Sequence, residues 1–330
     1  MDKVLLAHGG GGSKSAELTR LVFQRFFRDP LLLEMDDAAR LPGGGQVFTT
    51  DSFVVKPLFF PGGDIGRLAV CGTVNDLAVM GAEPLYLSIA FIIEEGFPVH
   101  QLEKILASIA NACRESGARI VCADTKVVER GKADGIFINT AGIGRPAFKK
   151  PVQARRVRPN DAIIINGDLG LHGISVLTAR GEFGLQGRIR SDVAPLWGLI
   201  KKCRALDIPF MRDPTRGGIA QTLNELAQGN KFGVRIHEDA LPIPANVAAV
   251  CDLLGFDPLH VANEGKVVMV VARRDAERAL KLLRNHPLGK GARVIGAITA
   301  ENPGQVTMAT RAGSERIVMA PVGEILPRIC

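Results

Sequence analysis

The sequence predicts a two-domain protein of the α+β or α/β class. The chain has 330 residues, which is more than one hydrophobic core usually holds. Strand patterns alternate with amphipathic helix patterns in both halves, and this mixture argues against a helix bundle or a β-sandwich. Glycine provides 37 residues, above the usual share of about 7%, and indicates many turns. We place an N-terminal domain at residues 1–150, a C-terminal α/β domain at 151–320, and a mobile tail at 321–330.

The composition narrows the classes of partner. The chain has one Trp and one Tyr, so few rings are available to stack on bases, and we expect no nucleic-acid partner. A net charge of +7 suits an anionic ligand. The sequence has neither a signal-peptide pattern at its start nor an apolar run near the roughly 18 residues of a membrane helix. We therefore expect a cytoplasmic protein without membrane association.

The cysteines point to a reducing compartment, because they show neither CxxC nor disulfide-scaffold spacing. They are Cys71, Cys113, Cys122, Cys203, Cys251 and Cys330. The first five fall in apolar segments, and we expect them to be small core residues. Cys330 ends the chain, after Pro327, Arg328 and Ile329. Prenylation requires a cysteine four residues from the end, so that interpretation fails. The thiol is either incidental or a nucleophile on a mobile end that can visit more than one site.

Near the N-terminus, a glycine-rich segment at residues 9–12 precedes Ser13 and Lys14. It does not match a Walker A motif, because Ser13 separates the glycines from Lys14. A phosphate cradle and a flexible arm both remain open. Hydrophobic spacing then predicts a helix over 15–27.

The rest of the first half follows from strand propensity and helix-end signals. The run QVFTTDSFVV is rich in β-branched and aromatic residues, which is typical of a strand. Asp64 can cap the N-terminus of a helix that Gly81 ends, and Gly117 ends the next helix. We expect strands at 46–55, 85–93, 119–123 and 135–143, and helices at 64–80 and 99–116.

Three aspartates lie in or beside apolar elements: Asp51 within a strand, Asp76 on a helix that is otherwise apolar, and Asp124 after a strand. A buried carboxylate is costly unless it is paired or binds a metal. Each could be a cap or half of an ion pair. Together they suit Mg²⁺, which proteins bind through a few carboxylates and substrate phosphates. Zinc would require clustered Cys and His ligands, which the chain lacks.

The basic segment at residues 145–158 is expected to be the linker between the domains, either solvated or a docking strip for an acidic partner. In the second half, Asp213 and Arg216 belong to RDPTRGG before a helix, and such a helix start is a natural anion site. Glu264 lies between Asn263 and Gly265, at the entry to a strand. We expect strands at 162–166, 233–237, 266–271 and 293–298, helices at 173–180, 219–228, 245–254 and 275–285, and a final hairpin.

Six segments carry a resemblance that spans the whole chain: TTDSFVV, VNDLAVMGA, ADTKVV, DPTRGG, ANEGK and the terminal PRIC. In this order they closely resemble the HypE family of hydrogenase maturation factors, the carbamoyl dehydratases. That family belongs to the aminoimidazole ribonucleotide synthetase-like (PurM-like) superfamily, whose other members lack the terminal cysteine. The resemblance implies a PurM-like two-domain fold in which the N-terminal mixed sheet forms a barrel across a homodimer, with an ATP site near the dimer interface.

The resemblance also implies a reaction. A carbamoyltransferase, HypF, loads a carbamoyl group onto the terminal cysteine, here Cys330. ATP-dependent dehydration then gives a thiocyanate, and the cyanide passes to iron on a HypC–HypD complex for nickel-iron hydrogenase. By motif, Lys126 corresponds to the residue that stabilises charge on the carbamoyl oxygen, and Glu264 to the general base. The remaining correspondences are Asp51, Asp76 and Asp124 for Mg²⁺ and ATP, and Asp213 and Arg216 for phosphate.

Two alternatives remain open. The protein could be a small-molecule ATP-dependent kinase of the same fold in which Cys330 is idle, or a non-catalytic carrier within the maturation complex. Deletion of Cys330 would leave substrate phosphorylation intact in the first case. In the second case, the carbamoylated protein would not turn over ATP.

Overall fold

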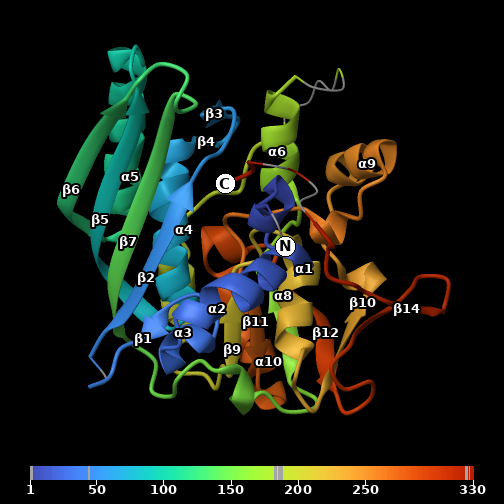
Figure 1. Ribbon diagram of the computed structural model, residues 1–330. Helices are drawn as coiled ribbons and strands as arrows, with labels where there is room; N and C mark the ends of the chain where they lie inside the picture. The colour runs from blue at the N-terminus through green and yellow to red at the C-terminus, as the bar shows by residue number, and fades with distance from the viewer. Residues whose placement is uncertain (1–2, 44, 182–183, 185–188, 324–325, 327) are drawn as a thin grey trace.

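The computed structural model describes residues 3–43, 45–181, 184, 189–323, 326 and 328–330. Two sheets stand side by side (Figure 1). The described residues form a five-stranded sheet of order β1-β2-β7-β5-β6 and a seven-stranded sheet of order β14-β13-β10-β12-β8-β11-β9. Only the pairs β5/β6 and β10/β13 within these sheets are parallel. Of the two expected classes, these pairings favour α+β for both halves.

The element bounds agree with most of the expected ranges. The strands of the first sheet are β1 (Ala39–Arg40), β2 (Val47–Phe53), β5 (Ala82–Glu94), β6 (Arg119–Val128) and β7 (Ile136–Pro146). Those of the second are β8 (Ala162–Ile165), β9 (Phe210–Arg212), β10 (Gly233–His237), β11 (Val268–Val271), β12 (Arg293–Thr299), β13 (Val306–Ala309) and β14 (Glu315–Ile317). A short hairpin joins β3 (Phe59–Phe60) and β4 (Gly63–Asp64). The α-helices are α1 (Ser13–Leu18), α2 (Gln24–Phe26), α3 (Pro30–Leu33), α4 (Ile65–Val79), α5 (Val99–Ser116), α6 (Leu171–Ala179), α7 (Trp197–Ile200), α8 (Gly218–Ala227), α9 (Ala245–Leu254) and α10 (Ala276–Arg284). Among the described residues, no helix is long and apolar enough to cross a membrane.

Helix α4 lies between the two halves and is buried on nearly every side (Figure 1). Its N-terminus is capped as the sequence predicts, because the Asp64 carboxylate accepts hydrogen bonds from the N–H groups of Gly66 and Arg67. The helix packs on the first sheet through β2, β5 and β7, and on the second half through α7 and β9. A helix that is apolar all round must be covered all round, so α4 joins the two halves into one packed unit.

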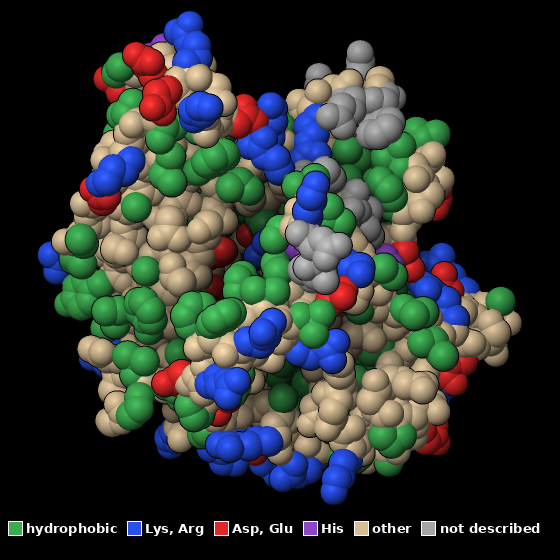
Figure 2. Space-filling view, in the orientation of Figure 1, with side chains coloured by type: hydrophobic (Ala, Val, Ile, Leu, Met, Phe, Trp, Pro, Cys, Tyr) green, Lys and Arg blue, Asp and Glu red, His purple; other side chains and the backbone are tan. Residues whose placement is uncertain are grey.

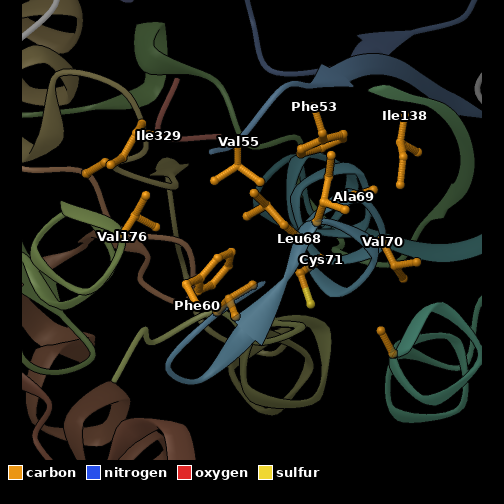
Figure 3. Close-up of a cluster of buried hydrophobic side chains, with 14 of the residues drawn as sticks. Phe53, Val55, Phe60, Leu68, Ala69, Val70, Cys71, Ile138, Val176 and Ile329 are labelled. Atoms are coloured by element: carbon orange, nitrogen blue, oxygen red, sulfur yellow. The ribbon is translucent and has the colours of Figure 1, made fainter. Parts of the chain in front are cut away.

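One hydrophobic cluster crosses this junction. It includes Phe53 and Leu68 from the first half, Val176 from α6, and Ile329 from the chain's end. Figure 3 shows Ile329 and Val176 on one side of this cluster, with Val55 between them and Leu68. Ile329 is only 3% exposed. The end of the chain is therefore a part of the core in this structure.

Two expectations about the first half are wrong. Strand β6 does not end at Asp124 but continues to Val128, because it pairs with β5 along its whole length. Cys122 lies on this strand and is exposed, not a core residue. The reason is that β6 is an edge strand whose residues are mostly exposed on both faces.

The basic linker is partly docked onto the second half. Lys150 donates to Asp207 at 2.9 Å, and Arg156 and Arg274 also pair with this carboxylate. These cations hold the pKa of Asp207 below its ordinary value, with the Lys150 hydrogen bond as the main cause. The charges of this segment are thus used, at least in part, to hold the linker against its own protein.

Burial of α4 makes a clear prediction for stability. We expect Leu68→Ala, at a fully buried position, to lower the free energy of unfolding by about 2–5 kcal/mol through lost transfer energy and a residual cavity. Leu253→Ala is the matched control, because Leu253 is 69% exposed and its truncation should change stability by less than about 0.5 kcal/mol. Urea denaturation measures both values, and equal effects would contradict the central role of α4.

Candidate active site

Four carboxylates that the sequence singles out meet at the junction of the two halves. Asp51 lies on β2, Asp76 on α4, Asp213 just after β9, and Glu264 in the loop before β11. Asp213 is 7% and Glu264 2% exposed. Figure 2 shows acidic side chains within a hollow near the centre of the molecule, between the two halves. The fold therefore gathers acids that are distant in the sequence.

Burial of so many acids suppresses their ionisation. Burial, together with the negative charges of Asp213 and Asp51, raises the pKa of Asp76 well above its ordinary value. Burial also raises the pKa of Asp213 to about 8. The pKa of Glu264 is likewise raised well above its ordinary value, first by burial and then by Asp213 and other carboxylates. Added positive charge at this cluster would therefore favour ionisation of its acids.

Arginines supply the nearby positive charge. The charge of Arg216 opposes the rise in the pKa of Asp51 and of Glu264, where burial is the larger effect. Arg216 also donates to the Gly9 carbonyl at 2.8 Å. Arg212 lies beside this group, only 12% exposed, and pairs with Asp37 and Glu225. Arg216 is thus the cation placed between the carboxylates and the glycine-rich segment.

The loop that carries Glu264 is held rigidly by residues to which the sequence analysis gave no role. The Asp192 carboxylate accepts hydrogen bonds from the N–H groups of Glu264 and Gly265, and it pairs with Lys266 at 2.8 Å. The Asn75 side chain donates to the Glu264 carbonyl. A Cβ on Gly265 would lie 1.8 Å from the Asp192 carbonyl oxygen, so this position requires glycine. Asn75 could have been recognised as a polar residue on an apolar helix, whereas Asp192 carries no local signal.

Within one subunit, Asp124 and Lys126 lie apart from the four carboxylates. Ala123 pairs with Ile89 on the helix-covered face of the sheet, so the next residue, Asp124, and then Lys126 point from the opposite face. Asp51 lies three strands away on the helix side, roughly 14 Å across the sheet. Lys126 and Asp124 form an exposed ion pair at 2.6 Å. A single subunit therefore does not bring Asp124 and Lys126 to Asp51.

The described end of the tail is docked next to the strand that carries Asp51. The N–H of Val54 donates to an oxygen of Cys330 at 3.1 Å, and the N–H of Lys56 donates to the Arg328 carbonyl at 3.2 Å. These bonds form a short antiparallel ladder beyond the end of β2. Pro327, the first residue of the PRIC motif, lies outside the described residues. The ladder places Cys330 beside Val54, three residues after Asp51 in the chain.

The glycine-rich segment closes over the start of the tail. Ser13 donates from its N–H to Pro321 and from its hydroxyl to Val322. Gly11 has a φ of +78°, and a Cβ there would lie 2.8 Å from Arg216 Cβ. Of the two interpretations left open, the contacts in this structure are those of an arm that packs on the tail and on Arg216.

Comparison with known proteins identifies the family. The family described as AIR synthase related protein matches through its N-terminal domain at residues 35–145 and its C-terminal domain at 158–309. The carbamoyl dehydratase HypE of Rhizobium leguminosarum bv. viciae is 50% identical over 99% of this chain and 95% of its own length. The chain belongs to the HypE family of carbamoyl dehydratases. The terminal PRIC motif thus correctly indicated the branch of the superfamily.

Solved structures agree with this assignment. The HypE structure in a HypE–HypF complex has a TM-score of 0.88 and 49% identity, covering 92% of this chain and 99% of that one. A HypE structure in complex with ATP has a TM-score of 0.83 and 44% identity, covering 99% of this chain and all of that one. Thiamine monophosphate kinase from Aquifex aeolicus, at 17% identity, shares the fold alone. The PurM-like two-domain fold is therefore confirmed.

The Asp192–Lys266 pair gives a prediction that depends on pH. Burial alone would raise the pKa of Asp192, but Lys266 and the hydrogen bonds lower it below its ordinary value. Its contribution to stability is then fully present above about pH 4 and is lost as the pH falls through the folded-state pKa. We expect Asp192→Asn to destabilise the protein by about 3–5 kcal/mol at pH 7, because it leaves a buried ammonium unpaired.

The difference in the free energy of unfolding between Asp192→Asn and the wild type, measured by urea titration, should narrow below about pH 4. Glu83→Gln removes the exposed pair with Arg145 and should cost less than about 1 kcal/mol at any pH. A constant cost of Asp192→Asn across the pH range would contradict the ionic role of this carboxylate.

Proposed function

We propose that this protein dehydrates an S-carbamoyl group on its own Cys330 to an S-cyano group, at the expense of ATP. The observation that carries the proposal is the terminal cysteine itself, docked beside the strand of Asp51 in a chain that matches carbamoyl dehydratases along its length. The cyanide would be supplied to the iron of a nickel-iron hydrogenase.

Activation of the carbamoyl oxygen makes the reaction feasible, because oxide is a poor leaving group and phosphate a good one. The carbamoyl oxygen attacks the γ-phosphorus of ATP, ADP leaves, and one proton departs from nitrogen. The C–O bond then breaks, phosphate leaves with the electron pair, and the second nitrogen proton is removed as C≡N forms. The products are S-cyano-Cys330, ADP and phosphate.

The residues divide this work between them. Glu264 is the general base for the nitrogen proton, and its fixed loop keeps it in place. Arg216 and Asp213 lie before α8, where Arg216 would bind phosphate oxygens. Lys126 would stabilise charge on the carbamoyl oxygen. Because burial and neighbouring carboxylates raise the pKa of Glu264, added positive charge nearby would favour the ionised form that acts as a base.

The carboxylate cluster fits Mg²⁺. Its acids are kept from ionising by burial and mutual repulsion, which a cation would relieve, and carboxylate oxygens are the ligands that Mg²⁺ prefers. Among the described residues, no three acidic, His or Cys side chains lie together as a metal site, so phosphate oxygens or a second subunit would have to complete it. Asp51, Asp76 and Asp124 would hold the ion, and Mg²⁺ would offset negative charge on the transferred phosphoryl group.

We further propose a homodimer in which the exposed sheet faces form a barrel. Phe48, Tyr86 and Ile92 project from this face and are 41–44% exposed, while Val121 and Val127 on β6 are 59% and 67% exposed. Such an exposed strand edge is a place where another chain can pair. A dimer would let Asp124 and Lys126 of one subunit reach the carboxylates of the other, which they do not reach within one chain.

The remaining partners follow from the proposed reaction. HypF would load the carbamoyl group, and a HypC–HypD complex would accept the cyanide, in the cytoplasm. A small-molecule kinase is less favoured, because the kinase of this fold is similar at only 17% identity. A non-catalytic carrier would have no need of a buried Glu264 held by Asp192.

The first prediction concerns the order of the two modifications. Intact-mass spectrometry after mixing with HypF, carbamoyl phosphate and ATP should show one carbamoyl adduct, which then loses the mass of one water. Glu264→Gln should stop the loss of water but not the adduct, and deletion of Cys330 should abolish both. Glu301→Gln, on the exposed surface, is the control and should behave as wild type. Continued cyanide delivery without Cys330 would disprove the proposal.

The second prediction tests whether the site is shared between subunits. Asp124→Asn and Glu264→Gln should each be inactive alone. After unfolding and refolding together, they should regain about a quarter of wild-type activity, because about half of the dimers are mixed and each mixed dimer has one intact site. If Asp124 serves its own subunit, the mixture stays inactive. Size-exclusion chromatography with light scattering checks that dimers form.

A further inference from the structure

His172 is buried where the tail enters the core, although the reaction proposed above gives it no role. It is the second residue of α6 and is fully buried. Its Nε2 lies 2.8 Å from the Ile329 carbonyl oxygen, and its Nδ1 lies 2.8 Å from Ser191 Oγ. Phe60 packs against the ring edge-on, with centroids 5.4 Å apart. The ring therefore has a polar partner on each nitrogen and an apolar contact on its face.

The chemistry of these partners fixes the direction of each hydrogen bond. A carbonyl oxygen only accepts, so Nε2 carries the proton. Burial lowers the pKa of His172, so the ring is neutral at pH 7 and Nδ1 accepts from the Ser191 hydroxyl. The Ser191 oxygen in turn accepts from the N–H of Val193 at 3.1 Å. A directed chain thus runs from the backbone beside Asp192 to the tail.

This contact completes the grip on the last three residues. The carbonyl of Arg328 and an oxygen of Cys330 face the segment after β2, where Lys56 and Val54 donate to them. The carbonyl of Ile329 points to the other side of the extended backbone, as alternate carbonyls of a strand do. His172 meets it there. The tail is therefore bound along both edges, with the Ile329 side chain in the core.

We propose that His172 is the positioning residue for Cys330: its Nε2–H holds the docked tail so that the carbamoylated sulfur remains at the carboxylate cluster during dehydration. The inference rests on the proposed function and deepens it. The hydrogen bond from His172 to the Ile329 carbonyl exists only while the tail is docked. It must therefore break whenever Cys330 leaves to receive its carbamoyl group. His172 thereby stabilises the docked tail, in which dehydration occurs, and not the released tail, which receives the carbamoyl group.

Alkylation of thiols tests the docking directly. With a limiting amount of iodoacetamide, His172→Phe should react at Cys330 roughly tenfold faster than the wild type, the usual effect of one lost hydrogen bond with a buried carbonyl left unpaired. Phe keeps the ring and its packing on Phe60. His172→Gln retains an N–H donor and should restore most of the protection. The exposed Cys122 serves as an internal reference for reagent activity.

The matched control is His260→Phe. His260 makes the same kind of hydrogen bond, 3.0 Å long, to the carbonyl of Met319. Met319 precedes the tail, so this bond does not hold the last three residues. Its loss should leave Cys330 alkylation and dehydration unchanged. Global unfolding is read from the buried thiols of Cys71, Cys203 and Cys251. If His172→Phe exposes these, Ser191→Ala replaces it in the test and should give a smaller, several-fold increase at Cys330 alone.

The functional readout separates positioning from a general loss of structure. In single-turnover mass spectrometry, His172→Phe should accept the carbamoyl group no more slowly than wild type, lose water roughly tenfold more slowly, and show an unchanged KM for ATP. Equal alkylation and dehydration in His172→Phe and wild type would overturn the inference. So would a loss of dehydration that His172→Gln does not relieve. If the wild type itself never loses water, the proposed function fails instead, and alkylation alone then decides whether His172 docks the tail.

Discussion

The main constraint on this structure is the energetic cost of gathering several carboxylates at the junction of its two halves. Asp76 is a half-buried position on a helix that is buried on nearly every side, and Asp51, Asp213 and Glu264 approach it from three other segments. Each of these acids is desolvated, a cost that hydrogen bonds, protons or cations can offset. In the isolated chain, hydrogen bonds from Thr49 and Ser52 and the charge of Arg216 offset part of this cost. A nucleotide with its metal would add a stronger source of positive charge, so its binding would favour ionisation of these acids.

Two segments near this cluster differ in how they are held: the loop of Glu264 is fixed within the core, and the tail is docked against it. The backbone of Glu264 is fixed by buried hydrogen bonds: its N–H donates to Asp192 and its carbonyl accepts from Asn75. The described part of the tail is held by backbone bonds to Val54 and Lys56, by the His172 bond, by the Arg328–Asp134 ion pair and by the buried side chains of Leu326 and Ile329. This division suits a reaction in which the base must wait in place while its substrate, carried by the protein itself, comes and goes.

The sequence predicted well what depends on local signals and poorly what depends on neighbours. The central helix, its Asp64 cap and the strand with Asp51 agreed with the structure, because capping and β-branched runs act over a few residues. The extension of β6 past Asp124 was missed, since pairing with β5 decides it. The same holds for β9, three residues with no pattern of their own, and for Asp192, which acquires its role only when Lys266 folds against it. Motifs placed Asp124 and Lys126 in the site, yet the single chain leaves both on the opposite face of the sheet.

The way the tail is bound has a practical meaning for work with this protein. Val54 donates to an oxygen of the last residue, so the chain terminus itself is part of the contact. A purification tag fused after Cys330 would turn the terminal carboxylate into a peptide bond and force further residues through a junction packed around Ile329. The N-terminal arm and the tail pack against each other near the chain ends. Tags and fluorescent labels should therefore be placed elsewhere, on the exposed surface of the second half.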